Sequence, residues 1–218
     1  FDDQQVGTIL ETLSETGLAD DTVVIYTSDH GELAGEHGLW WKMSFYEGSA
    51  GVPLVVSWPG HFSEGRREAM PVTLADLAPT LASLGGAPPI PGVRLSGFAD
   101  VLRGDPGDTE RAVFSELIGD SVGARLPKGP SGGPSRMMRK GGWKCNYYHG
   151  EPPELFHLAE DPEEMVDLAS DPACRTTLEA MLAEILSDWD PEDVAVRAEE
   201  QRKIMDYVRS APGDPDVL

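Results

Sequence analysis

A short apolar run that ends in a polar loop constrains this chain more than any other stretch. Residues 23–27 are mostly apolar and rich in β-branched side chains, which predicts a buried strand. The strand leads directly into Ser-Asp-His-Gly-Glu, so Asp29 and His30 stand where it ends. In open α/β sheets, sites gather at the carboxyl ends of strands because the loops there converge on a crevice. The run therefore predicts a buried strand with a site at its end.

Asp29, His30 and Lys42 together could form a metal-assisted anion site. A carboxylate and an imidazole can bind a divalent cation, and a lysine on the following loop can reach an anion bound to it. The bound cation and the lysine would both neutralise the negative charge that builds up on oxygen during phosphoryl or sulfuryl transfer. An Asp-His pair at a strand end can equally be a capping and hydrogen-bonding pair, and the residues alone leave both interpretations open.

The composition limits the classes of partner. With 218 residues, 40% hydrophobic and 25% charged, the chain resembles an ordinary globular protein of one or two domains. Its formal net charge of −21 repels nucleic acid and anionic membranes, so neither is expected as a partner. No apolar run approaches the roughly 20 residues of a membrane-spanning helix. Cys145 and Cys174 do not make a disulfide framework, and we expect both to be structural.

The order of the predicted elements indicates the α/β class and two parts. Helix and strand alternate over residues 6–13, 23–27, 52–58 and 74–84. This alternation favours a mostly parallel sheet flanked by helices within residues 1–105. After a proline-rich linker, residues 106–218 predict a small antiparallel α+β subdomain and an acidic tail.

Local signals in the second part indicate a hairpin, a helix and a loop. Gly141 and Gly142 separate two strand-like runs, which predicts a hairpin. Apolar spacing predicts a helix over residues 178–189. Residues 121–135 are rich in Gly, Pro and Ser, which is typical of a loop. The segment from residue 191 onward is expected to be helical at best and frayed at its end.

An extended set of matches resembles the sulfatase family. The matching stretches are residues 21–25, 28–32, 35–38, 41–42, 46–49, 52–56, 76–80, 155–158 and 161–168. They cover most of residues 1 to about 188 in the family's order, as the carboxy-terminal portion of such an enzyme. The resemblance implies the alkaline-phosphatase-like fold and hydrolysis of a small sulfate ester. Residues 38–49 look closest to choline-sulfatase-like members.

The resemblance also implies roles for three residues. Asp29 and His30 would be metal ligands, and Lys42 would bind the sulfate group and take part in catalysis. Ca²⁺ is the expected cation, and Mn²⁺ or Mg²⁺ is an alternative. Mn²⁺ is considered because a His ligand tolerates a softer ion than an all-oxygen site does. The family's nucleophile is a formylglycine matured from Cys or Ser in Cys/Ser-x-Pro-x-Arg. Neither Cys145 nor Cys174 fits this motif. The formylglycine is therefore expected in a missing N-terminal part, and this fragment alone is expected to be inactive.

Two alternatives to a sulfatase remain open from the sequence. The first is a phosphonate monoester or phosphodiester hydrolase of the same superfamily, which shares the Asp-His pair. The second is a non-catalytic, truncated paralogue that keeps the fold. The sequence also leaves a homo-oligomer open. Trp40 and Trp41 could form a cation–π wall for a quaternary ammonium group, but we expect them to pack beneath the loop.

Overall fold

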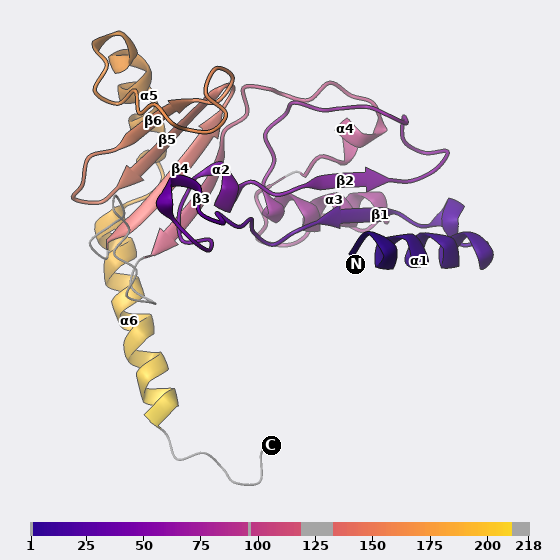
Figure 1. Cartoon of the computed structure of the whole chain (residues 1–218). Coiled ribbons are helices and arrows are strands. Elements are labelled where there is room, and N and C mark those ends of the chain that lie inside the picture. The colour runs from indigo at the N-terminus through magenta and orange to yellow at the C-terminus, as the bar shows by residue number, and fades with distance from the viewer. Residues whose placement is uncertain (1, 96, 119–132, 211–218) are drawn as a thin grey trace. The chain divides into compact units, whose positions relative to one another are not determined.

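A computed structural model describes residues 2–95, 97–118 and 133–210 of the chain (Figure 1). Most of the segment expected to form a loop, residues 121–132, lies outside them. The chain divides into two compact units. The first comprises Phe1–Lys42 and Gly48–Val113, and the second comprises Met43–Glu47 and Phe114–Leu218. The second unit therefore takes five residues from within the sequence of the first.

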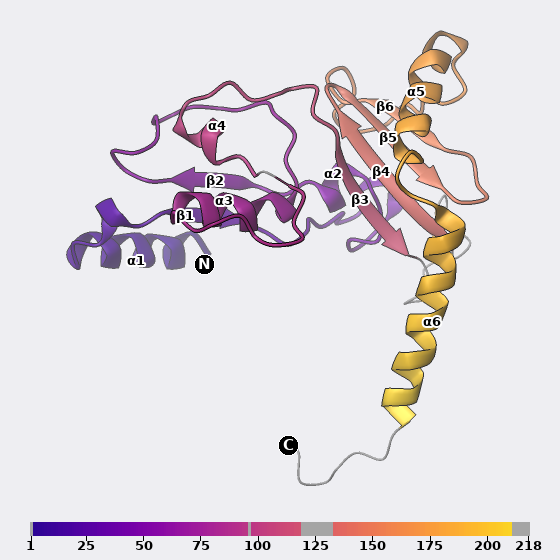
Figure 2. The ribbon, with the colours of Figure 1, turned by 180° about the vertical axis from the view of Figure 1, so that it is seen from behind.

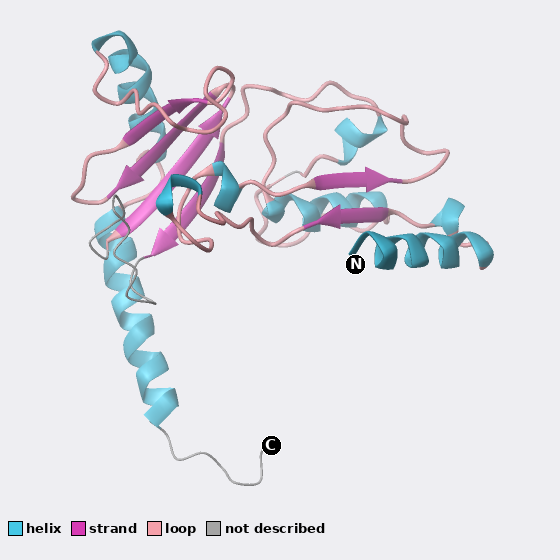
Figure 3. Ribbon diagram, in the orientation of Figure 1, coloured by secondary structure: helices cyan, strands magenta, loops and turns pink. Residues whose placement is uncertain are grey.

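Helices and strands alternate in the first unit, as the sequence predicted. Helix α1 (Asp2–Glu15) is followed by the strand β1 (Val24–Thr27), and β2 (Leu54–Ser57) is followed by α3 (Leu77–Leu84). A short helix α4 (Ala99–Arg103) completes the unit. Both strands and both predicted helices are confirmed, and Figure 3 shows them by class. The expected burial of the first strand is wrong, because β1 is only part-buried and Tyr26 is 49% exposed.

The direction of the strand pair differs from the expected parallel arrangement. β1 and β2 pair antiparallel, with Val24 opposite Ser57 and Thr27 opposite Leu54. Parallel neighbours need a crossover connection, usually a helix. The connection here contains only a 3₁₀ turn at Glu36–Gly38 and the four-residue helix α2 (Glu47–Ala50). The chain therefore reverses direction between these two strands, and no parallel pair occurs in the described residues.

A buried carboxylate fixes the start of α3. Asp76 is 0% exposed and accepts a hydrogen bond from the backbone N–H of Thr73 at 2.9 Å, within a capping box. Its two oxygens also face the guanidinium of Arg111, at 2.6 and 2.8 Å. Bidentate pairing of this kind both neutralises and orients a buried carboxylate. The pair ties the start of α3 to the end of the unit.

The second unit is built on a four-stranded antiparallel sheet in the order β3-β4-β5-β6. The strands are Val113–Ile118, Pro134–Lys140, Trp143–Tyr148 and Glu154–His157. β4 and β5 form the hairpin predicted from the two glycines, and Gly141 has a φ of 56°, which a residue without a Cβ adopts easily.

The two faces of this sheet differ in chemistry because side chains alternate along each strand. Helix α5 (Arg175–Ile185) packs on β4 and β5, behind the sheet in Figure 1 and in front of it in Figure 2. The core of the unit contains fully buried Met138, Cys145, Leu155 and Ile185. Burial of each such side chain contributes about 1.5–3 kcal/mol. The side chains of β5 that alternate with Cys145 point to the other face, which places Lys144, Asn146 and Tyr148 together there.

Helix α6 (Pro191–Ser210) is longer and more regular than the sequence indicated. Its 20 residues carry Arg and Lys one turn after Asp and Glu, for example Arg197 after Asp193 and Lys203 after Glu199. Such spacing stabilises an exposed helix modestly. Among the described residues, no helix combines the length and the apolar character needed to cross a membrane.

The two cysteines are free thiols in different surroundings. Burial, with a smaller contribution from the charge of Asp167, raises the pKa of the Cys145 thiol to about 12. Because the thiolate is the reactive form, Cys145 should stay unlabelled by a disulfide reagent at pH 8 in the folded protein, whereas half-buried Cys174 reacts. Mass spectrometry before and after denaturation measures this. A Cys174→Ser variant should take up no label until it unfolds, and labelling of Cys145 in the folded protein would contradict its burial.

Candidate active site

The turn after β1 brings Asp29 and His30 together, as predicted from the sequence. The Ser28 hydroxyl donates to the carbonyl oxygen of His30 at 2.8 Å, and the backbone N–H of His30 donates to Asp29 Oδ1 at 3.0 Å. These bonds fold the chain back directly after the strand. They leave Asp29 Oδ2 3.4 Å from His30 Nε2, so an oxygen and a nitrogen donor lie side by side.

The neighbours of the His30 ring determine which nitrogen carries the proton. Nδ1 lies 2.7 Å from the carbonyl oxygen of Gly31, which can only accept, so Nδ1–H donates. Nε2 lies 2.6 Å from Lys42 Nζ, and an ammonium can only donate, so Nε2 accepts. A backbone carbonyl that holds one ring N–H in this way is the usual support for a metal-ligating histidine. Nε2 is therefore left with its lone pair directed toward Asp29 and Lys42.

Lys42 is the third member of this group. Its ammonium occupies the lone pair of His30 Nε2, the same electron pair that a cation would take. A cation at Nε2 would thus release the lysine toward another acceptor, such as a bound anion. The side chain of Asp29 is 82% exposed and that of His30 is 37% exposed, so the three groups lie open to ligands in this structure.

The electrostatic surroundings keep Asp29 ionised. Desolvation acts to raise its pKa, but the electrostatic interaction with the His30 ring, hydrogen bonds from the backbone N–H groups of Asp29 and His30, and the charge on Lys42 outweigh this effect. The net result is a pKa of Asp29 below its ordinary value. A carboxylate that is charged at neutral pH is the form that binds a cation.

The donors suit part of a divalent metal site. Asp29 and His30 offer carboxylate oxygens and one imidazole nitrogen, a mixture that several divalent ions accept. In the part of the chain that the structure describes, no group of three or more His, Cys, Asp and Glu side chains could hold a metal ion. Since Ca²⁺ takes six to eight ligands, the pair could supply only a share of them.

The loop between Gly31 and Lys42 is held by its own backbone. Glu32 Oε1 accepts from the N–H of Trp41 at 2.6 Å, and the N–H of Leu33 donates to the Trp41 carbonyl at 3.0 Å. Trp41 has a φ of 70°, a conformation that is strained for a bulky residue. Space is also short at Gly31, where a Cβ atom would overlap the carbonyl oxygen of Gly48.

The expected packing of two tryptophans beneath this loop is wrong. Trp40 is 68% exposed and Trp41 is 66% exposed. The backbone at Trp41 is left-handed, and the bond from its N–H to Glu32 holds this conformation. Exposed aromatic side chains of this size stand immediately before Lys42 in the chain.

The sequence placed residues 46–49 within the family resemblance but gave Tyr46 and Glu47 no role of their own. Tyr46 and Glu47 belong to the second unit and contact its sheet through polar side chains. The available signal was a lysine, an asparagine and a tyrosine at alternating positions of β5, a polar face in a strand that is otherwise apolar. The partners on Glu154 and Glu164 lie more than 100 residues away, and no local pattern reveals such pairs.

Comparisons with known proteins agree on one family. Residues 2–87 match the family model for Sulfatase. The chain is 36% identical over 217 residues to a choline-sulfatase of Rhizobium meliloti (strain 1021), an alignment that covers 94% of this chain and 39% of that protein. The chain thus spans well under half the length of this curated relative.

Solved structures of similar proteins share the fold. A protein in complex with its substrate D-glucosamine-2-N,6-O-disulfate superposes with a TM-score of 0.73 at 23% identity, over 87% of this chain and 39% of that one. At this identity the likeness concerns the fold alone. The phosphonate monoester hydrolase of Agrobacterium radiobacter superposes with a TM-score of 0.72 at 30% identity, over 85% of this chain and 38% of that one.

Proposed function

This chain belongs to the sulfatase family, and on that premise we propose that the protein of which it forms part hydrolyses small sulfate esters. The observation that carries the proposal is the convergence of Asp29, His30 and Lys42 after β1, inside the region that matches the family. A relative named for choline, 36% identical, supports a small sulfate ester as the substrate.

We assign the roles from the contacts of each side chain. Asp29 Oδ2 and His30 Nε2 would hold a divalent cation, with Ca²⁺ preferred and Mn²⁺ or Mg²⁺ as alternatives. Such a cation supplies charge neutralisation at the sulfate oxygens. Lys42 would donate hydrogen bonds to a sulfate oxygen and stabilise negative charge there. The formylglycine nucleophile and the other ligands are expected outside these 218 residues, so we expect the chain alone to be inactive.

The same proposal covers the architecture and the partners of the whole protein. We expect the β1–β2 pair to join a larger, mostly parallel sheet, with residues 1–105 as the C-terminal part of an α/β core and residues 106–218 as a small subdomain with an acidic tail. The net charge of −21 argues against nucleic acid or a membrane as a partner, and a homo-oligomer remains open.

A phosphonate monoester hydrolase is the second candidate, supported by the solved structure with 30% identity. Phosphonate and sulfate esters both place negative charge on oxygens around a central atom, so the three side chains described would serve either substrate. The choline-sulfatase relative covers more of this chain, which favours the sulfate ester. A non-catalytic paralogue is the third candidate.

A rate comparison in the full-length protein tests the proposal. With one aryl leaving group offered as a sulfate and as a phosphonate ester, we expect the larger kcat/KM on the sulfate ester. The 218-residue chain, purified under the same conditions, should show no turnover above a Lys42→Ala control. Faster turnover of the phosphonate would favour the second candidate, and no turnover of either by full-length protein would favour the third.

A further inference from the structure

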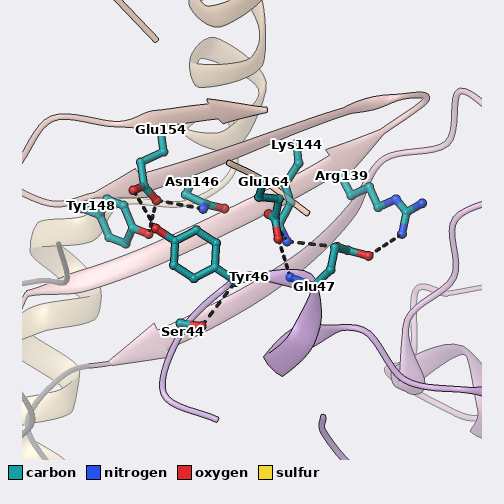
Figure 4. Close-up of polar contacts among 9 residues, drawn as sticks. All are labelled: Ser44, Tyr46, Glu47, Arg139, Lys144, Asn146, Tyr148, Glu154 and Glu164. Carbon is teal, nitrogen blue, oxygen red and sulfur yellow. Dashed lines mark hydrogen bonds and ion pairs between the residues drawn. The ribbon is translucent and has the colours of Figure 1, made fainter. Parts of the chain in front are cut away.

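We propose that Tyr46 and Glu47 are positioning residues for Lys42, and that a polar cluster with a buried centre on the β3–β6 sheet holds them in place. This inference rests on the proposed role of Lys42. The cluster consists of Tyr46 and Glu47 together with Arg139, Lys144, Asn146, Tyr148, Glu154 and Glu164 (Figure 4). All eight belong to the second unit, whose segment Met43–Glu47 follows Lys42 directly in the chain.

Glu47 is held by both its backbone and its side chain. Its N–H donates to Glu164 Oε2 at 2.5 Å. Its Oε1 pairs with Lys144 Nζ at 2.9 Å, and its Oε2 pairs with Arg139 at 3.2 Å. Lys144 is 0% exposed and also pairs with Glu164 at 2.8 Å, so one buried ammonium lies between two carboxylates (Figure 4). Contacts to the N–H and to both carboxylate oxygens of Glu47 hold this residue in one position.

Tyr46 is held by a second buried carboxylate. Its hydroxyl donates to Glu154 Oε1 at 3.2 Å, and Glu154 also accepts from Tyr148 at 2.8 Å and Asn146 at 3.2 Å. Glu154 is 3% exposed, and these three donors satisfy its charge without a cation. Burial and the charge on Glu154 raise the pKa of Tyr46, so its hydroxyl stays protonated and remains a donor.

The energetic cost of burying this cluster suggests that it fixes one conformation of the segment Met43–Glu47 rather than adding stability. Apolar side chains of the same volume often give equal or greater stability than a buried ion pair, because charges lose their hydration on burial. The ion pairs and hydrogen bonds, however, are directional, so they form together only when the segment Met43–Glu47 has one position and one orientation. The rings of Phe45 and Tyr148 stack nearby with centroids 6.1 Å apart. This apolar contact stabilises the position of the segment but constrains its orientation less.

Lys42 adjoins the anchored segment Met43–Glu47 in the chain, and its own backbone is tied to the turn after β1. Its carbonyl oxygen accepts from the Ser49 hydroxyl at 2.5 Å, and the Ser49 carbonyl accepts from the N–H of Gly31 at 2.8 Å. Residues on both sides of Met43–Glu47 are thus tied to the turn that carries His30. A lysine side chain is long and flexible, so a fixed backbone is the means by which its ammonium reaches one place. A displacement of about 1 Å in a reacting group can cost about 10²-fold in rate.

A double-mutant cycle in the full-length protein tests whether the cluster acts through Lys42. Glu47→Gln should lower kcat on a sulfate ester by about 10-fold, below the full cost of a displaced group, with KM nearly unchanged. In a Lys42→Ala background the same change should have almost no further effect, because the group it positions is gone. A Glu184→Gln control breaks the ion pair between Lys140 of β4 and Glu184 of α5 and should leave kcat unchanged. Full additivity of the two changes would overturn the proposal.

Amide hydrogen exchange gives a readout that does not depend on activity. Glu47→Gln and the milder Tyr46→Phe should both speed exchange in residues 31–42, where the amides of Leu33 and Trp41 are bonded, and Glu184→Gln should not. If Glu47→Gln fails to fold, Tyr46→Phe carries both measurements. Unchanged exchange in this loop would overturn the positioning role. Faster exchange, together with a kcat that Lys42→Ala leaves unchanged, would instead overturn the proposed role of Lys42 and leave the anchoring of the loop intact.

Discussion

Replacing Lys42 by alanine in the full-length protein should lower kcat on a sulfate ester by about 10²–10³, the cost of losing one preorganised electrostatic donor. The ammonium would face charge that grows on oxygen as the S–O bond breaks, so it stabilises the transition state more than the bound substrate. KM should therefore change much less than kcat. Steady-state kinetics on an aryl sulfate measure both values.

Metal analysis separates the role of Lys42 from that of Asp29. Lys42→Ala should keep its bound metal, because the ammonium carries no free electron pair and cannot be a ligand. Asp29→Ala should lose metal and activity together, because its carboxylate is one of the two donors that the turn after β1 presents. If Lys42→Ala strips the metal, or raises only KM, the role assigned to this lysine is wrong.

Replacing Lys144 by methionine should destabilise the folded protein by about 3–5 kcal/mol. Lys144 is 0% exposed and lies against Glu47 and Glu164, so the variant leaves two carboxylates without their shared cation. Urea unfolding of the full-length protein, followed by circular dichroism, measures the loss. The matched control is Lys140→Met, because the Lys140–Glu184 pair is more than a third exposed and such pairs contribute about 0–1 kcal/mol. Equal losses in the two variants would contradict the burial of this charge.

The pH dependence of the Lys144 variant follows from Glu164. Burial raises the pKa of the Glu164 carboxyl even with Lys144 beside it, and removing that cation should raise the pKa further. A carboxyl with a raised pKa in the folded state favours folding most where it is protonated, and that contribution is lost as the pH rises through the folded pKa. The destabilisation by Lys144→Met should therefore be larger at pH 8 than at pH 5, and Glu164→Gln in addition should recover part of it.

Local patterns in the sequence were sufficient for most elements and for the turn that carries Asp29 and His30. The β-branched run found β1, helical spacing found α3, and the paired glycines found the β4–β5 hairpin. These features depend on neighbours in the chain, which a sequence displays directly. The Asp-His pair followed for the same reason, since two adjacent residues at a strand end can hardly be separated.

Features that depend on distant contacts could not be predicted. The antiparallel pairing of β1 and β2 depends on how the connection between them folds, which its composition did not reveal. Helix α6 is longer and more regular than expected, because many weak ion pairs between its charged side chains stabilise it. The contacts of Tyr46 in the second unit include the buried carboxylate of Glu154, 108 positions further along the chain, and the ring of Phe156.

That long separation bears on how the protein is made. A chain leaves the ribosome from its N-terminus, so Lys42 and the loop before it emerge well before β4, β5 and β6 exist. The partners of Tyr46 and Glu47 follow 108 and 117 positions later. The loop around Lys42 therefore lacks the contacts that Tyr46 and Glu47 make with Glu154 and Glu164 until nearly the whole second unit has been synthesised, and a chain that stops early keeps only the loop's own hydrogen bonds.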